Sequence, residues 1–300
     1  MASVERKVLI TGASGLLGRA ILKAFKRAKW NPLGLAYSRA EGELKKVDLT
    51  DSKEAEDVIQ NFQPDLVIHC AAQRFPDKVE KFYDESYKLN VETSKNLAKL
   101  ASEKGAAFIF ISTDYVFDGT NPPYKENDKV SPINKYGKTK ADAEAAIEEV
   151  NDESIILRVP VLYGNEEYSS ESAISVLLDC LLSNVPKSVS DYEIRYPSHT
   201  DDIALICLEL GEKKLQDPSI KGIYQWCGLE SLTKYQMVKI MAEVLGLSAN
   251  HVTGDPNPSS GAPRPHNTQL CRTKLESLGI RKHTNFKEGI KEFSKFLKSS

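Results

Sequence analysis

The stretch KVLITGASGLLGRAILKAF, residues 7–25, constrains the fold more than any other part of this 300-residue chain. A short apolar run is followed by Gly12, Gly15 and Gly18, and then by apolar residues at helical spacing. The first glycine of such a loop permits the turn, the second lets a pyrophosphate approach the backbone, and the third lets helix and strand pack closely. The stretch therefore predicts the start of a βαβ unit with a dinucleotide phosphate at the helix N-terminus.

The same alternation continues through the first half of the chain. We expect further strands at residues 32–37, 66–70, 107–112 and 154–159, and helices at 51–62, 82–104 and 141–150. Because these strands are apolar throughout, they predict a parallel sheet covered on both faces, a doubly wound α/β fold of the Rossmann type. After residue 161 the rhythm loosens. There we expect helices at residues 172–182, 202–210, 234–245 and 286–297, and short strands at 195–196 and 223–226.

The predicted organisation is a dinucleotide-binding domain over residues 1–160 and a smaller C-terminal lobe over 161–300, intertwined as one structural unit. The formal net charge of −2 argues against nucleic-acid binding. No apolar run approaches the ~18 residues of a membrane span, and the N-terminus has neither a signal core nor a transit segment. Five scattered cysteines without C-x-x-C spacing indicate reduced thiols in the cytoplasm. The histidines lack ligand spacing, so we expect no metal.

The end of the second strand indicates which dinucleotide binds. An NAD site usually has an acidic residue there, which holds the ribose 2′-hydroxyl. This chain reads LAYSRA, with Ser38 and Arg39 at that place. The guanidinium fork matches phosphate oxygens, so Arg39 favours NADP over NAD, unless it is only a solvated surface side chain. Asp48 and Leu49, after the third strand, are expected to border the adenine.

The motif YGKTK places Tyr136 and Lys140 four residues apart, which is one face of a helix. A free tyrosine has a pKa of about 10, and a nearby ammonium should lower it. The pair could then act as a general acid or base on a carbonyl or alcohol beside a nicotinamide. Lys140 would also bind the nicotinamide ribose, and Thr113, at the end of the fifth strand, would hold the substrate oxygen.

Three stretches, STDYVFDG (112–119), YGKTK and LRVPVLYG (157–164), carry a resemblance to the extended short-chain dehydrogenases/reductases, in the dTDP-4-dehydrorhamnose reductase-like branch. The resemblance implies that Thr113, Tyr136 and Lys140 form the catalytic triad. It also places Cys70, Ala71, Ala72, Arg74 and Leu162 along the cofactor. The complete set of predicted cofactor contacts is Gly12, Ser14, Gly15, Leu16, Leu17, Gly18, Arg39, Asp48, Leu49, Cys70, Ala71, Ala72, Arg74, Tyr136, Lys140 and Leu162.

A narrower resemblance comes from DGTNPPYKENDKVSPINKYGKTK, LQDPSIKGIYQW, LTKYQM and GAPRPHNTQLCRTKLESLGI. These stretches are similar to the regulatory β subunits of methionine adenosyltransferase, reductase-like proteins that bind NADP and associate with a catalytic subunit. The resemblance implies such a partner here. Proteins of that group contact it through an extended C-terminal tail, whereas this sequence stops at KFLKSS, so we do not expect docking through such a tail.

Three functions are compatible with these observations. The first is an NADP-binding regulatory subunit that supports S-adenosylmethionine synthesis by its partner; the chain lacks the G-x-x-x-x-G-K-[ST] loop and does not make that product alone. The second is an NADPH-dependent reductase of a 4-keto nucleotide sugar. The third is a sensor in which NADP occupancy biases assembly.

A few further polar residues have structural readings. His69 lies inside an apolar strand and is expected to be a packed core histidine. Asp114 and Asp118 are expected to order the loop after the fifth strand. Arg195 and Arg264 are weaker candidates to bind a nucleotide diphosphate from the C-terminal lobe.

Overall fold

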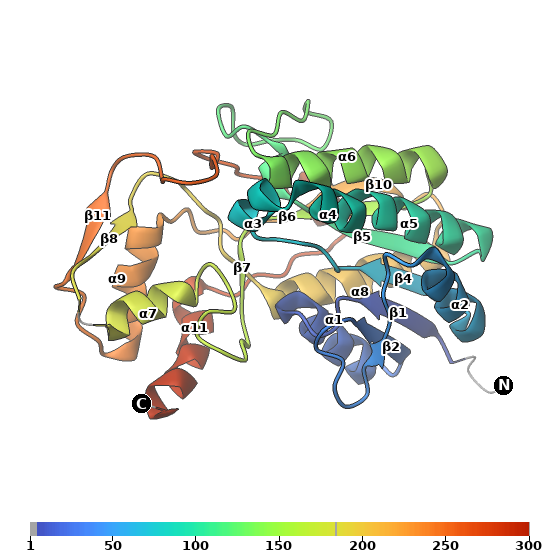
Figure 1. Ribbon diagram of the computed structural model, residues 1–300, viewed down its shortest axis with the longest axis horizontal. Helices are drawn as coiled ribbons and strands as arrows, with labels where there is room; N and C mark the ends of the chain where they lie inside the picture. The colour runs from blue at the N-terminus through green and yellow to red at the C-terminus, as the bar shows by residue number, and fades with distance from the viewer. Residues whose placement is uncertain (1–4, 184, 300) are drawn as a thin grey trace.

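The computed structural model describes residues 5–183 and 185–299. Its main feature is a seven-stranded sheet in the order β10-β6-β5-β4-β1-β2-β3, in which every neighbouring pair is parallel (Figure 1). The strands are β1 (Lys7–Thr11), β2 (Asn31–Ala36), β3 (Lys45–Lys46), β4 (Leu66–His69), β5 (Ala107–Thr113), β6 (Ile155–Val159) and β10 (Gly222–Gln225). The predicted doubly wound Rossmann-type fold is confirmed. The strand order reverses at β1, and ligands of such sheets bind outside the carboxyl ends of the strands at that point.

Helices cover both faces of the sheet, as Figure 1 shows. They are α1 (Leu16–Arg27) and α8 (Thr200–Gln216) on one face, and α2 (Ser52–Phe62), α5 (Thr93–Glu103) and α6 (Lys135–Val150) on the other. Strand β1 illustrates why the strands are apolar throughout. Val8 and Ile10 belong to the core under α1 and α8, while Leu9 belongs to the core on the opposite face, and all three are fully buried.

The region expected to be one helix at residues 82–104 is broken. It contains α4 (Tyr83–Tyr87), a π-helical segment (Lys88–Glu92) and then α5, and a separate short helix, α3 (Pro76–Lys81), precedes it. The π segment carries Asn90, whose buried side chain accepts from the backbone N–H of Gln73 at 2.8 Å and donates to its carbonyl at 3.1 Å. Apolar spacing does not reveal the extra residue in such a turn, which is why the sequence suggested a single helix.

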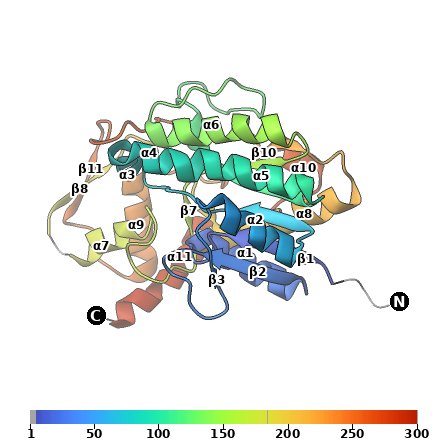
Figure 2. The same cartoon turned by 45° about the vertical axis from the view of Figure 1, so that its right-hand side comes forward.

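The C-terminal lobe has its own core and a small parallel sheet (Figure 2). Its elements are α7 (Val176–Leu182), β8 (Lys187–Ser190), α9 (Lys234–Leu245), β11 (Val252–Asp255), α11 (Phe286–Ile290) and a 3₁₀ segment (Lys291–Ser299). The expected helix at 286–297 thus ends early and continues in 3₁₀ form. The strand expected at 195–196 is wrong: Arg195 makes only an isolated bridge to Leu232.

The chain passes between the lobes several times. After β7 (Leu162–Tyr163) it enters the C-terminal lobe, and it returns at β9 (Ser198–His199), which pairs with β7. Helix α8 and β10 then complete the main sheet and its cover, and α10 (Thr273–Ser277) packs against β10. The division into residues 1–160 and 161–300 stays a prediction. Two elements of the second range, α8 and β10, belong to the main sheet and its cover.

Candidate functional site

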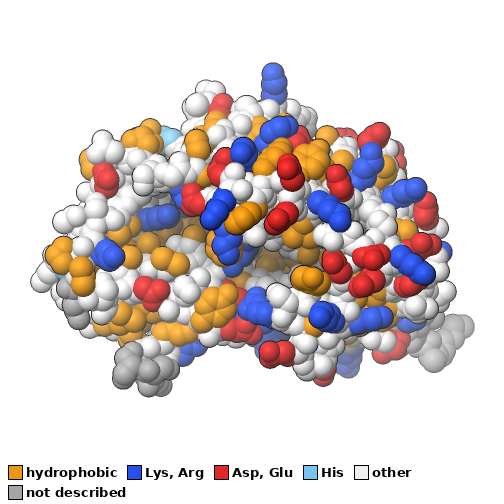
Figure 3. Space-filling model, in the orientation of Figure 1, with side chains coloured by type: hydrophobic (Ala, Val, Ile, Leu, Met, Phe, Trp, Pro, Cys, Tyr) orange, Lys and Arg blue, Asp and Glu red, His pale blue; other side chains and the backbone are white. Residues whose placement is uncertain are grey.

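A cavity of about 780 Å³ opens at the carboxyl edge of the main sheet, at the strand reversal. The space-filling view shows the surface hollowed between the lobes, with basic and apolar side chains around the opening (Figure 3). The cavity brings together every predicted cofactor contact and the three residues of the predicted triad. These are Gly12, Ser14, Gly15, Leu16, Leu17, Gly18, Arg39, Asp48, Leu49, Cys70, Ala71, Ala72, Arg74, Thr113, Tyr136, Lys140 and Leu162.

The glycine loop leaves no room for side chains. A Cβ on Gly18 would lie 2.2 Å from the carbonyl oxygen of Gly12, and a Cβ on Gly12 would lie 2.8 Å from the backbone nitrogen of Ala71. Gly12 also has a φ of 64°, a backbone conformation that favours glycine. Helix α1 begins at Leu16 after Gly15, without a side-chain cap and without an acidic residue in its first turn. Bare backbone at a helix N-terminus fits a phosphate group.

The end of the cavity beside β2 and β3 holds Arg39, Asp48 and Leu49. Arg39 donates to the carbonyl of Ser14 at 2.7 Å, across the glycine loop, and its guanidinium is also 3.2 Å from Glu167. It is therefore not a purely solvated side chain. Asp48 accepts from the backbone and hydroxyl of Thr50, so its carboxylate shapes its own loop.

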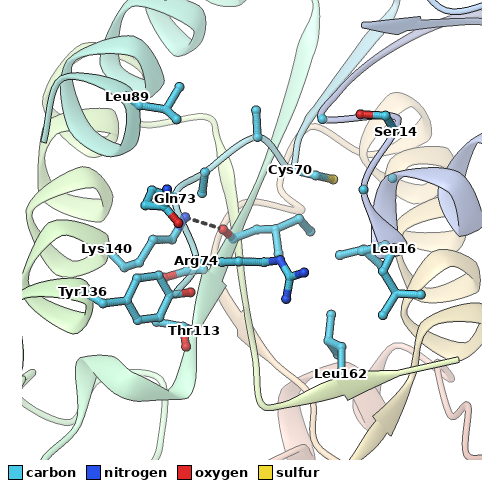
Figure 4. Close-up of a pocket in the computed structure, with 18 of the residues that line it drawn as sticks. Ser14, Leu16, Cys70, Gln73, Arg74, Leu89, Thr113, Tyr136, Lys140 and Leu162 are labelled. Atoms are coloured by element: carbon cyan, nitrogen blue, oxygen red, sulfur yellow. Dashed lines mark hydrogen bonds between the residues drawn. The ribbon is translucent and has the colours of Figure 1, made fainter. Parts of the chain in front are cut away.

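Successive residues at the end of β5 contact positions four residues apart on α6. The carbonyl of Ile111 accepts from Lys140 Nζ at 2.7 Å, the Ser112 hydroxyl donates to Glu144, and the Thr113 hydroxyl lies beside that of Tyr136. Figure 4 shows Thr113 and Tyr136 close together on one wall of the cavity. Helix α6 starts at residue 135, earlier than expected.

The start of α6 is fixed by two features. The Asn134 side chain caps the helix by accepting from the N–H of Gly137 at 2.7 Å. A Cβ on Gly137 would lie 2.1 Å from the carbonyl oxygen of Tyr115, so the helix approaches the loop after β5 very closely.

The expected coupling between Lys140 and Tyr136 is wrong for this arrangement. Burial raises the pKa of Tyr136 to about 12, and the adjacent Thr113 hydroxyl offsets this only in part. Burial lowers the pKa of Lys140 to about 7, and the charge of Glu144 opposes this only in part. The lysine turns toward the Ile111 carbonyl and the face of the Phe110 ring, 3.7 Å from its centroid, rather than toward the phenol. Tyr136 thus keeps its proton near neutral pH.

A buried ion pair lies behind the triad. Arg158 of β6 donates to both carboxylate oxygens of Glu144, at 2.6 and 3.0 Å, and both side chains are almost completely buried. Removing one partner of such a pair leaves an uncompensated buried charge. The pair therefore fixes α6, and with it Tyr136 and Lys140, against the sheet.

Sequence reasoning missed several residues of the cavity wall, among them Gln73, Leu89, Ile111 and Ala173. Gln73 and Ile111 lie at or just beyond the carboxyl ends of β4 and β5, so the rule that ligands bind at these ends could have found them. Leu89 lies in the π segment and Ala173 in the C-terminal lobe. No motif marks either.

The histidine and the two aspartates that the sequence read as structural have such roles here; of these three, Asp114 also lines the cavity. His69 is buried between Thr11 and Ser94, and burial lowers its pKa to about 3, so it is a neutral core histidine as expected. Asp118 orders its loop by accepting from Thr120, Tyr124 and Ser131. Asp114 is buried as well and accepts from the hydroxyls of Thr113 and Thr268.

The side chains of Arg195 and Arg264 both form hydrogen bonds or ion pairs within the protein. Arg195 donates to the carbonyls of Ile194 and Pro265, and Arg264 pairs with Asp77. Neither is among the residues that line the cavity.

Comparison with known proteins agrees with this geometry. The RmlD substrate binding domain family matches residues 6–299. Methionine adenosyltransferase 2 subunit beta of Mus musculus is 47% identical over 290 residues, which is 96% of this chain and 87% of that relative. The chain belongs to the RmlD-like family, in its methionine adenosyltransferase subunit β group.

Solved structures of RmlD-like reductases share the fold of this subunit β-like chain. A dTDP-4-dehydrorhamnose reductase from Clostridium acetobutylicum has a TM-score of 0.83 at 29% identity, covering 97% of this chain and 99% of that one. The same enzyme from Bacillus anthracis, solved in complex with NADP, has a TM-score of 0.84 at 25% identity, covering 99% and 100%. Within residues 5–183 and 185–299, no helix is long and apolar enough to cross a membrane.

Proposed function

We propose that this chain is an NADP-binding regulatory subunit of methionine adenosyltransferase, which associates with the catalytic subunit and supports its synthesis of S-adenosylmethionine. The observation that carries the proposal is the 47% identity to a subunit β over 290 residues, 96% of this chain. We place the protein in the cytoplasm, which fits its five free cysteines.

The residues of the cavity fit a nicotinamide dinucleotide. The glycine loop would hold the pyrophosphate, because glycine backbone with no side-chain cap and no acidic residue lies at the start of α1. Lys140 would bind the nicotinamide ribose. Arg39 would bind the 2′-phosphate of NADP, and the NADP complex of a related reductase supports this choice over NAD.

The second function, an NADPH-dependent reductase of a 4-keto nucleotide sugar, is favoured by one observation: the triad is complete and faces the cavity. Bound NADPH would supply a hydride. Tyr136, protonated at neutral pH, would donate a proton to the carbonyl oxygen, and Thr113 would hold that oxygen. The family favours the regulatory function over this one.

Calorimetric titration of this protein with a purified methionine adenosyltransferase catalytic subunit, with and without NADP, tests the first function. We expect a saturable association. Its absence under both conditions contradicts the proposal. The second function requires NADPH oxidation with a 4-keto nucleotide sugar that is lost in Tyr136→Phe. Turnover that survives this substitution contradicts the proposed role of the phenol.

A further inference from the structure

A segment of the C-terminal lobe reaches the phosphate end of the cavity. Residues 164–172 follow β7 and pass beside α1 (Figure 1). The Glu171 carboxylate, 1% exposed, accepts from both terminal nitrogens of Arg19, at 2.8 and 2.7 Å. Arg74 donates to the Glu171 backbone carbonyl. Glu171 therefore anchors the segment on the first turn of α1 and on the cavity wall.

This anchor places a second carboxylate next to Arg39. The backbone N–H of Glu167 donates to Glu171 at 2.8 Å, which fixes where the Glu167 side chain begins. Its carboxylate then lies 3.1 Å from Arg19 and 3.2 Å from Arg39. Arg39 in turn donates to the carbonyl of Ser14 in the glycine loop. The region after β2 has no acidic residue of its own beside Arg39. The Glu167 carboxylate, from a distant part of the chain, lies there instead.

We propose that Glu167 sets how strongly the pocket distinguishes a dinucleotide with a 2′-phosphate from one without it. The proposal rests on the proposed function, because it takes Arg39 as the partner of that phosphate. A phosphate bound to Arg39 adds negative charge beside Glu167, and like charges at this distance repel. NAD has a hydroxyl at that position, which adds no charge. Glu167 therefore weakens NADP binding relative to NAD.

Repulsion between the 2′-phosphate and Glu167 should act on the Glu167 side chain and not on Glu171, within the segment 164–172. Glu171 is buried and holds two hydrogen bonds from Arg19, whereas the Glu167 and Arg39 side chains are about half exposed. The Glu167 side chain can therefore leave while the anchor stays. Tyr168, which is 45% exposed, follows directly, so a surface residue at the lobe junction moves with the occupancy of the phosphate site.

The test is calorimetric affinity for NADPH and for NADH in wild type, Glu167→Gln and a control, Glu149→Gln. Glu149 also forms an exposed ion pair, but with Lys95, whereas Glu167 pairs with Arg39. We expect Glu167→Gln to tighten NADPH binding about two- to five-fold and to leave NADH within about two-fold. The control should change neither. In an Arg39→Met background, Glu167→Gln should lose its effect on NADPH, because the two side chains are coupled.

Hydrogen exchange of peptides covering residues 164–172 gives an independent reading. Wild type should exchange faster there with saturating NADPH than with NADH, and Glu167→Gln should show no such difference. If the ratio of NADPH affinity to NADH affinity is the same in wild type and in Glu167→Gln, this inference is overturned and the proposed function is not affected. If wild type binds neither dinucleotide, the proposed cofactor and this inference fall together.

Discussion

Arg74 and Arg264 lie on either side of the junction between the lobes, and they have different surroundings. The Arg74 side chain extends into the cavity between Tyr136 and Leu162, as Figure 4 shows, and it donates a hydrogen bond to the Glu171 carbonyl. Arg264 is held by three protein oxygens, at 2.9 Å from Asp77 and at 3.1 and 3.0 Å from the carbonyls of Ser260 and Ala262.

The same contrast holds more widely. In the Rossmann layer, bare glycine backbone and the side chains of Arg39, Tyr136 and Lys140 face the cavity. In the C-terminal lobe, Arg195 is buried and bound to backbone carbonyls. A site for a nucleotide sugar would need cations directed at its diphosphate, whereas these arginines already bind the protein. The difference fits a chain that keeps a dinucleotide site and uses its second lobe for structure or association.

We expect the largest effect on the cavity in the Rossmann layer from Gly18→Ala. This substitution introduces a Cβ that would be 2.2 Å from the carbonyl oxygen of Gly12. Backbone cannot yield as a side chain does, so α1 must shift away from the loop. Overpacking of this kind costs about 1–3 kcal/mol. We expect dinucleotide affinity, measured by calorimetry, to fall by up to about 100-fold.

Gly105→Ala is the matched control. Gly105 has a φ of 71°, but a Cβ there meets no atom within 4 Å, and the residue lies outside the cavity. The strained backbone should cost about 1–2 kcal/mol of unfolding free energy without changing the dissociation constant. If both variants lose affinity equally, the glycine loop has no special role in binding.

The second test concerns the charge of Lys140. Its pKa in the folded protein is about 7 against an ordinary value of 10.5. Between these two values the unfolded chain binds more protons than the folded protein, so the free energy of unfolding rises with pH from about 7 to about 10.5. Below about pH 7 the buried ammonium is charged, and its full destabilising effect is present. Lys140→Met, which keeps the stem without the charge, should therefore be most advantageous below pH 7, and the advantage should shrink toward pH 10.

Urea unfolding of wild type and Lys140→Met at several pH values measures this difference. Lys138→Met is a suitable control, because Lys138 lies on the exposed side of the same helix and pairs with Asp142. A constant difference between wild type and Lys140→Met across this range would show that Lys140 is not held as a destabilised buried cation.

Much of the site could be predicted because its signals are local. The glycine loop, the strand ends and the YGKTK helix each lie within a few residues, and backbone geometry fixes what such short stretches do. The parallel sheet then brings the strand ends together whatever the intervening sequence. This is why Gly18 and Thr113, far apart in the chain, line the same cavity.

The rest depends on contacts between distant segments. Nothing near Glu167 marks it as a neighbour of Arg39, because the contact is created by the anchor of Glu171 on Arg19. The state of Lys140 was misjudged for a related reason. The sequence shows that it shares a helix face with Tyr136, but not that burial and the Ile111 carbonyl determine where the ammonium lies.

The smallest expected effect belongs to Arg264→Ala. Its partner Asp77 is 60% exposed, so the lost ion pair should cost no more than about 1 kcal/mol of unfolding free energy. NADPH affinity should stay unchanged. We expect wild type to bind dTDP weakly or not at all, because Arg264 binds Asp77 and two carbonyls instead of a ligand, and the substitution should not change this. Asp77→Asn, which breaks the same pair from the other side, should match it in urea unfolding. Clear dTDP binding to wild type that is lost in Arg264→Ala but kept in Asp77→Asn would mean that the second lobe binds a nucleotide. The contrast between the lobes would then fail, and the weight would move toward the reductase.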